Sequence, residues 1–161
     1  MKLPWRRRDD PQARIDALVA QYSGSDQAFF LMLYPDGAGP RWPPRPVRGH
    51  TISGWVDALR ITHVNRCYLE TYAFPQGHDP TGWSLDHLTG SRTASMRLLV
   101  EFYSIGGFSQ VELMRRRMDG HLMKLRGEYQ VLHHQRRVLG HYGLERDCTE
   151  QLVRPLAPTL H

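Results

Sequence analysis

The chain of 161 residues carries a formal net charge of +5 at pH 7, so a polyanion is a candidate partner. Its longest apolar run, residues 28–34, is much shorter than the ~18 residues that span a membrane. The first ten residues lack the apolar stretch of a signal peptide, and two cysteines cannot form a disulfide framework. We therefore expect a reduced, cytoplasmic setting without membrane contact.

Residues 1–49 are predicted to form an N-terminal extension of α/β type. Asp10 followed by Pro11 is typical of a helix start, and Ser23-Gly24-Ser25 ends that helix. Residues 29–34 have the composition of a strand, which Pro35-Asp36-Gly37 ends. Four prolines and three arginines then crowd into residues 39–49, so we expect a stiff, extended arm there and a domain boundary after it.

The segment 50–83 has the outline of a helix-turn-helix. A first helix is predicted after Thr51 or Ser53, because apolar side chains follow at helical spacing up to Leu59. A second helix is predicted over residues 62–72, and a loop or wing over residues 75–83. Two short helices separated by about three residues are the pattern of this DNA-binding motif.

A third helix is predicted to start at Ser95 and end at Gly106-Gly107, and a short helix is predicted after Ser109. From Leu122 to Tyr142 the spacing of apolar side chains is that of a heptad seam, which predicts one long helix. A narrow seam favours a partner helix over packing on the same domain, although that alternative stays open. Residues 143–161 are predicted to be an irregular tail, with a turn of helix around residues 150–153.

This order of elements resembles the MerR family of transcription regulators over residues 50–142. The matching positions are Ile52, Trp55, Val56, Ile61-Thr62, Cys67-Tyr68-Leu69-Glu70, Phe74-Pro75, Gly82-Trp83-Ser84, Gly107-Phe108-Ser109 and Glu112-Leu113. The resemblance implies a mainly α protein: a winged helix-turn-helix at 50–118 followed by a long antiparallel dimerisation helix at 119–142. It also implies a coiled-coil homodimer that binds double-stranded DNA, with RNA polymerase or another protein as a further partner.

Candidate DNA-binding residues follow from that arrangement. His63, Asn65, Arg66 and Tyr68 lie on the predicted recognition helix, where asparagine suits adenine and arginine suits guanine. Arg41, Arg45 and Arg48 belong to the arm and are candidates for phosphate or minor-groove contacts. An ordinary surface helix and a solvated linker are the respective alternatives. The predicted dimerisation residues are Leu122, Leu125, Tyr129, Leu132 and Leu139.

No metal site, cofactor site or enzymatic activity is predicted, because the histidines and cysteines lack tight ligand spacing and no catalytic motif is present. The first hypothesis is therefore a dimeric, DNA-binding, MerR-like regulator. A second hypothesis is a protein-binding adaptor on the same scaffold. It is motivated by Ser84, which replaces the wing arginine of the family, and by the N-terminal extension. An enzyme comes third.

Overall fold

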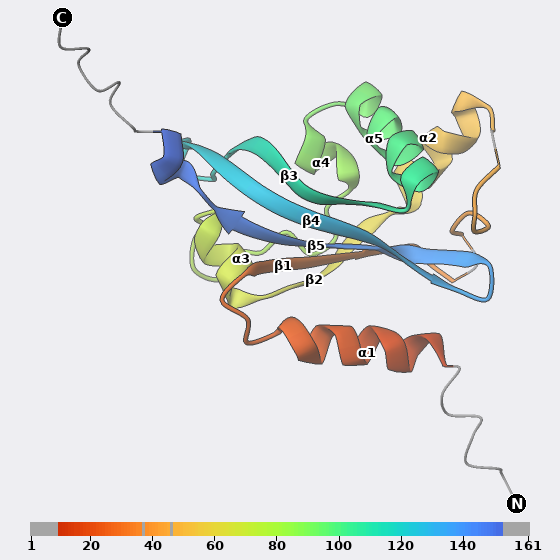
Figure 1. Ribbon diagram of the computed structural model, residues 1–161, viewed down its shortest axis with the longest axis horizontal. Coiled ribbons are helices and arrows are strands. Elements are labelled where there is room, and N and C mark those ends of the chain that lie inside the picture. Colours follow the sequence, from red (N-terminus) through yellow and green to blue (C-terminus); the bar gives the residue numbers. More distant parts are fainter. Residues whose placement is uncertain (1–9, 37, 46, 153–161) are drawn as a thin grey trace, which may run out of the picture.

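The computed structural model describes residues 10–36, 38–45 and 47–152 (Figure 1). The described residues form a five-stranded antiparallel sheet with the strand order β2-β1-β5-β4-β3, and helices cover both of its faces. The predicted mainly α fold is therefore wrong. Residue 153, the last of the predicted turn of helix around residues 150–153, lies outside the described residues.

The first two predicted elements are confirmed. Helix α1 (Pro11–Tyr22) begins after Asp10, whose carboxylate accepts a hydrogen bond from the Gln12 amide at 3.0 Å. Strand β1 (Ala28–Leu33) follows and pairs with β2 (Arg60–Val64) on one side and β5 (Arg137–Asp147) on the other. The N-terminal segment thus supplies a strand to the interior of the sheet.

The helix-turn-helix prediction is wrong. Helix α2 (Gly49–Ala58) exists, but residues 60–64 form β2, which pairs with β1. Only the short helix α3 (Arg66–Thr71) remains of the predicted recognition helix. Asn65 separates the two elements, because its side chain accepts a hydrogen bond from the Tyr68 amide at 2.9 Å and so starts α3.

The loop predicted over residues 75–83 is confirmed as irregular, and two helices follow it, the first short and the second of 14 residues. They are α4 (Leu85–Thr89) and α5 (Arg92–Ile105). Helix α5 starts earlier than predicted, because the Ser91 side chain accepts a hydrogen bond from the Ala94 amide at 3.1 Å. It ends as predicted at Gly106, which has a φ of 82° that glycine adopts without strain.

The last third of the chain is a strand meander. Strands β3 (Gly107–Arg116), β4 (Leu122–His134) and β5 replace the predicted short helix, dimerisation helix and irregular tail. Gly120 turns the chain between β3 and β4, and Gln135 and Arg136, with φ of 46° and 62°, form the tight turn before β5. The coiled-coil and dimerisation-helix predictions are therefore wrong. A 3₁₀ turn, η2 (Thr149–Leu152), ends the described chain and agrees with the predicted turn of helix.

Alternating burial along β4 explains why this segment is a strand. Met123, Leu125, Tyr129 and Val131 all belong to the core on one face of the sheet. Lys124 and Arg126 point to the other face, where both pair with Glu112 of β3. Burial therefore repeats every two residues along this segment, as in a strand. Several of its apolar residues match the heptad spacing only by coincidence.

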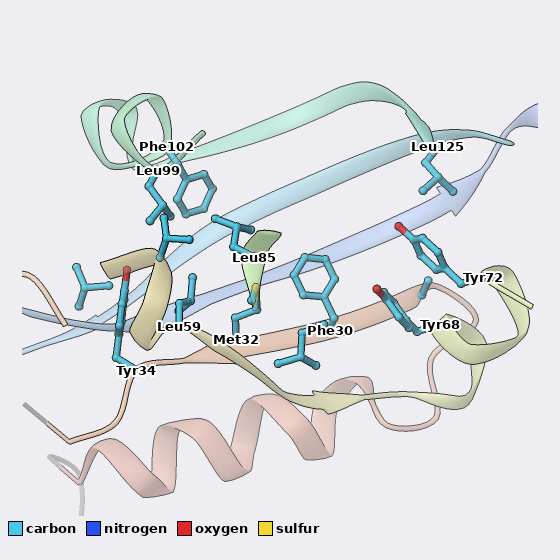
Figure 2. Close-up of a cluster of buried hydrophobic side chains, with 14 of the residues drawn as sticks. Phe30, Met32, Tyr34, Leu59, Tyr68, Tyr72, Leu85, Leu99, Phe102 and Leu125 are labelled. Atoms are coloured by element: carbon cyan, nitrogen blue, oxygen red, sulfur yellow. The ribbon is translucent and has the colours of Figure 1, made fainter. Parts of the chain in front are cut away.

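The sheet separates two hydrophobic cores. On one face α1 packs through Ile15 against a small cluster that includes Phe29 and Leu31 of β1 (Figure 1). On the other face lies the larger core, shared by the strands and helices α2 to α5. Figure 2 shows Phe30 and Met32 of β1 on the side of that strand facing away from α1.

Candidate functional site

The structure separates the four residues of the predicted recognition helix. Asn65 and Tyr68 are buried, with 5% and 1% of their surfaces exposed. The Asn65 amide is fully engaged: it accepts hydrogen bonds from the amides of Phe29 and Tyr68 and donates to the carbonyls of Tyr22 and Gln27. His63 is half-buried on β2, and Arg66 is exposed and paired with Glu70. Asn65 thus ties α1, β1 and α3 together.

The remaining predicted residues are dispersed. Arg41, Arg45 and Arg48 are exposed in the segment before α2. Leu125 belongs to the larger core, whereas Leu132 and Leu139 pack in the cluster under α1. Tyr129 is partly buried at the larger core, and Leu122 is 54% exposed. The five predicted dimerisation residues therefore share no single surface.

Within the described ranges, no group of three or more His, Cys, Asp or Glu side chains is placed to hold a metal ion. His63 and Cys67, which would share a helix face at i and i+4, instead lie on β2 and α3. No described helix is long and apolar enough to cross a membrane.

The candidate site is a cavity of about 520 Å³ between the sheet and the helices on its larger-core face, which we call the central cavity. This volume lies in the range of small-molecule pockets, roughly 300–1,000 Å³. Its walls are mostly aromatic and aliphatic. They include Phe30, Tyr68, Tyr72, Phe74, Trp83, Leu85, Leu99, Phe102, Phe108, Val111 and Tyr129. Figure 2 shows Phe30 pointing into the space between Tyr68 on one side and Leu85 on the other.

A buried carboxyl group is bound at one end of the central cavity. Glu145 is only 3% exposed, and it accepts hydrogen bonds from the hydroxyls of Tyr72 at 2.8 Å and Tyr129 at 2.7 Å. Burial raises the pKa of Glu145, an effect that the two hydroxyl donors and Arg115 oppose. Burial and the neighbouring carboxyl group also raise the pKa of both tyrosines, so their hydroxyls stay protonated as donors.

A buried imidazole lies on the same strand. His141 is 6% exposed, lines the central cavity and meets the Phe102 ring edge-on at 5.0 Å. Within the described chain, neither of its ring nitrogens has a hydrogen-bond partner, and Nδ1 is completely buried. Burial lowers the pKa of His141 from 6.5 to about 4, so the ring is neutral at pH 7. A neutral imidazole offers one donor and one acceptor.

Glycines on β4 and β5 make room for the aromatic side chains. A Cβ atom at Gly143 would lie 2.7 Å from Cδ1 of Tyr129 and closer still to the Phe30 ring. A Cβ at Gly127 would overlap the Tyr129 ring and hydroxyl. The absence of a side chain at these two positions lets the rings of Phe30 and Tyr129 pack close to the backbone of the sheet.

Tyr72, His141 and Glu145 were not among the predicted site residues. Tyr129 was singled out, but for a dimer seam. The missed signal was the glycine spacing: Gly127, Gly140 and Gly143 each weaken a helix by about 1 kcal/mol, and they favour a strand that other groups approach closely.

No protein-family model matches the chain, and a sequence comparison with curated proteins finds no match. Solved structures do match in fold. The PAS domain of a protein from Colwellia psychrerythraea aligns with a TM-score of 0.57 and 11% identity, covering 85% of this chain and 98% of that one. A light-oxygen-voltage (LOV) protein of Rhodobacter sphaeroides aligns with a TM-score of 0.57 and 14% identity, covering 85% and 68%.

A PAS domain from a two-component sensor histidine kinase also aligns, with a TM-score of 0.52, 11% identity and coverage of 86% and 99%. The chain therefore has the fold of PAS and LOV domains. This finding and the five-stranded sheet overturn the MerR resemblance, and with it the winged helix-turn-helix regulator and the adaptor on the same scaffold.

Proposed function

We propose that this chain is a sensory domain that binds a small, uncharged, largely aromatic or aliphatic molecule in the central cavity. The observation that carries the proposal is the cavity itself, about 520 Å³ with mostly apolar walls, one of which is formed by the buried His141, whose Nδ1 has no hydrogen-bond partner in the described chain. A ligand with one polar group would satisfy a ring nitrogen and bury its apolar part against the walls.

The part of the ligand beside His141 and Glu145 is expected to be uncharged, because the cavity disfavours charge there; the charged lining residues Glu101, Arg115 and Arg116 come from α5 and β3. Transfer of an isolated ion from water into apolar surroundings is costly unless the ion is paired. The His141 ring is neutral at pH 7, and the Glu145 carboxyl group is already bound by Tyr72 and Tyr129. An alcohol, amide or heteroaromatic nitrogen on the ligand would therefore suit His141 better than a carboxylate or an ammonium group.

Sensing requires that the ligand favour one state of the domain over another. The cavity walls come from α3, α4, α5 and the strands, so a bound molecule would contact elements that are far apart in the sequence. The structures with a similar fold include a domain of a sensor histidine kinase and an RNA-binding light-oxygen-voltage receptor. These likenesses support a sensory role in general and leave the signal itself to experiment.

Titration with N-phenyl-1-naphthylamine, a neutral aromatic fluorophore, tests the proposal. We expect a saturable rise in fluorescence at one site and a higher melting temperature with the probe bound, since binding stabilises the folded state. Val111→Trp should fill part of the cavity and weaken binding at least about tenfold. Amide hydrogen exchange with and without the probe should show changed protection in α3 or α5. This measurement tests whether binding alters the state of the domain, as sensing requires.

The matched control is Val100→Trp. Val100 is 47% exposed on α5 and does not line the cavity, so this variant should bind the probe as the original chain does. Equal weakening in both variants, or no saturable binding by the original chain, would contradict the proposal.

A further inference from the structure

A second hollow lies at the opposite end of the molecule from α3, where the β4–β5 turn meets the segment before α2 (Figure 1). It is lined by residues 40–45 together with Val47, Trp55 and Arg136, and we call it the arginine groove. Its volume is about 670 Å³, so it also has the size of a small-molecule site. None of its lining residues belongs to the lining of the central cavity.

Hydrogen bonds to β5 and to the turn before it hold the arginine groove in shape. The Trp42 amide donates to the Arg136 carbonyl at 2.6 Å, and the Val138 amide donates to the Pro40 carbonyl at 2.8 Å. The Arg137 guanidinium donates to the Gly39 carbonyl at 2.9 Å. These contacts explain why Arg136, which is almost a hundred residues from Arg41 in the sequence, lies beside it.

The charged side chains that line the arginine groove are all positive. Arg41, Arg45 and Arg136 line it, and no acidic side chain does so within the described residues. The guanidinium groups of these three arginines make no hydrogen bond or ion pair with any part of the chain that the structure describes. Each guanidinium group has five N–H donors that are open to an anion, and arginine binds phosphate in a bidentate manner.

Two tryptophans give the groove aromatic walls. The Trp42 ring stacks on His133 with centroids 5.0 Å apart and an angle of 14°, so its orientation is fixed. Trp55 of α2 meets Tyr103 edge-on at 6.0 Å. Indole faces stack well on heteroaromatic rings, and nucleic-acid bases commonly stack on aromatic side chains.

We propose that the arginine groove binds a free nucleoside phosphate, with the base against the tryptophans and the phosphate on the arginines. Unpaired arginines beside aromatic walls suit a ligand that is both anionic and heteroaromatic. The volume favours a mononucleotide over a polymer, which would need a longer track of cationic side chains. This site is independent of the central cavity and of the function proposed for it.

Isothermal titration with AMP, adenosine and inorganic phosphate tests the proposal on the full chain. AMP should bind saturably at one site, whereas adenosine and phosphate should each bind at least about tenfold more weakly, because each supplies only half of the contacts. AMP should leave the fluorescence of bound N-phenyl-1-naphthylamine unchanged, and Val111→Trp should bind AMP normally. These two readouts separate failure at this groove from failure at the central cavity.

Arg41→Gln, Arg45→Gln and Arg136→Gln should each weaken AMP binding about tenfold without changing the melting temperature, since their guanidinium groups hold no part of the fold. The control Arg66→Gln removes the same charge on α3, where Arg66 is exposed and pairs with Glu70. It should bind AMP as the original chain does.

Three results would overturn the proposal. The first is adenosine binding as tightly as AMP, which would show that the groove does not recognise the phosphate group. The second is an equal weakening of AMP binding by Arg66→Gln, which would mean that AMP binding responds to the net charge of the protein and not to the groove arginines. The third is a single-stranded adenosine oligonucleotide that binds far more tightly than AMP through the same arginines, which would make the groove part of a polymer track.

Discussion

Glu145 and His141 lie on the same strand, and burial changes their pKa values in opposite directions. The raised pKa of Glu145 means that the folded state holds this proton more tightly than the unfolded state does. Its contribution to stability is therefore greatest below the ordinary glutamate pKa and falls as pH rises from there towards the raised value. The lowered pKa of His141 has the reverse effect, because the unfolded chain takes up the proton first.

The lowered pKa of His141 makes its contribution to stability depend on pH. Between pH 6.5 and about 4 this imidazole binds more protons in the unfolded state, so its contribution to stability falls as pH falls through this range. The full loss is about 3 kcal/mol, from 1.36 kcal/mol for each pKa unit. We expect His141→Leu to show a smaller loss of unfolding free energy between pH 7 and pH 4.5, measured by urea denaturation at a series of pH values.

The matched control for this prediction is His78→Leu, in the exposed loop after α3. It should keep the pH dependence of the original chain. If His141→Leu also kept that dependence, the buried imidazole would not be the group that responds.

At the scale of the element, β4 shows how a strand and a helix seam are told apart. Leu122 and Leu125 are three residues apart, and a helix would place them on one face. In the strand they point to opposite faces, and Leu122 is 54% exposed whereas Leu125 is completely buried. The two leucines therefore form a matched pair for mutation.

Leu125→Glu should destabilise the fold by on the order of 4 kcal/mol, because it buries an unpaired carboxylate in the larger core. Leu122→Glu should change stability by less than about 0.5 kcal/mol, as exposed substitutions usually do. Thermal or urea unfolding measures both. Similar losses for the two variants would be evidence that Leu122 is covered by a partner.

At the scale of the whole molecule, α1 closes the face of the sheet that the other helices leave open. Ile15 of α1 is 7% exposed and packs in the cluster with Phe29, Leu31 and Leu132. Since the central cavity lies on the opposite face, the stability supplied by α1 and the binding of a ligand should be separable.

Ile15→Ala should therefore lower the free energy of unfolding by about 2–4 kcal/mol, from lost burial and the cavity left behind. The affinity for N-phenyl-1-naphthylamine should stay unchanged wherever the variant is folded. Val100→Ala, at an exposed aliphatic position on α5, should cost less than about 0.5 kcal/mol. A large fall in probe affinity for Ile15→Ala would mean that the two faces of the sheet are coupled.

The elements that the sequence predicted correctly are those with local signals. Asp10 and Pro11 start α1 through a side-chain cap, an apolar run makes β1, and Gly106 ends α5 through its positive φ. Each signal acts within a few residues, so no distant part of the chain is needed to interpret it.

Only the tertiary structure decided the rest. Residues 122–142 satisfy a heptad spacing and an alternating pattern at once, and pairing of β4 with β3 and β5 selects the strand. The central cavity unites Phe30 with Glu145, and the arginine groove unites Arg41 with Arg136. Sheet pairing brings together residues that are about a hundred positions apart in the sequence. Composition and periodicity describe neighbouring residues only, so they do not predict which distant segments pair.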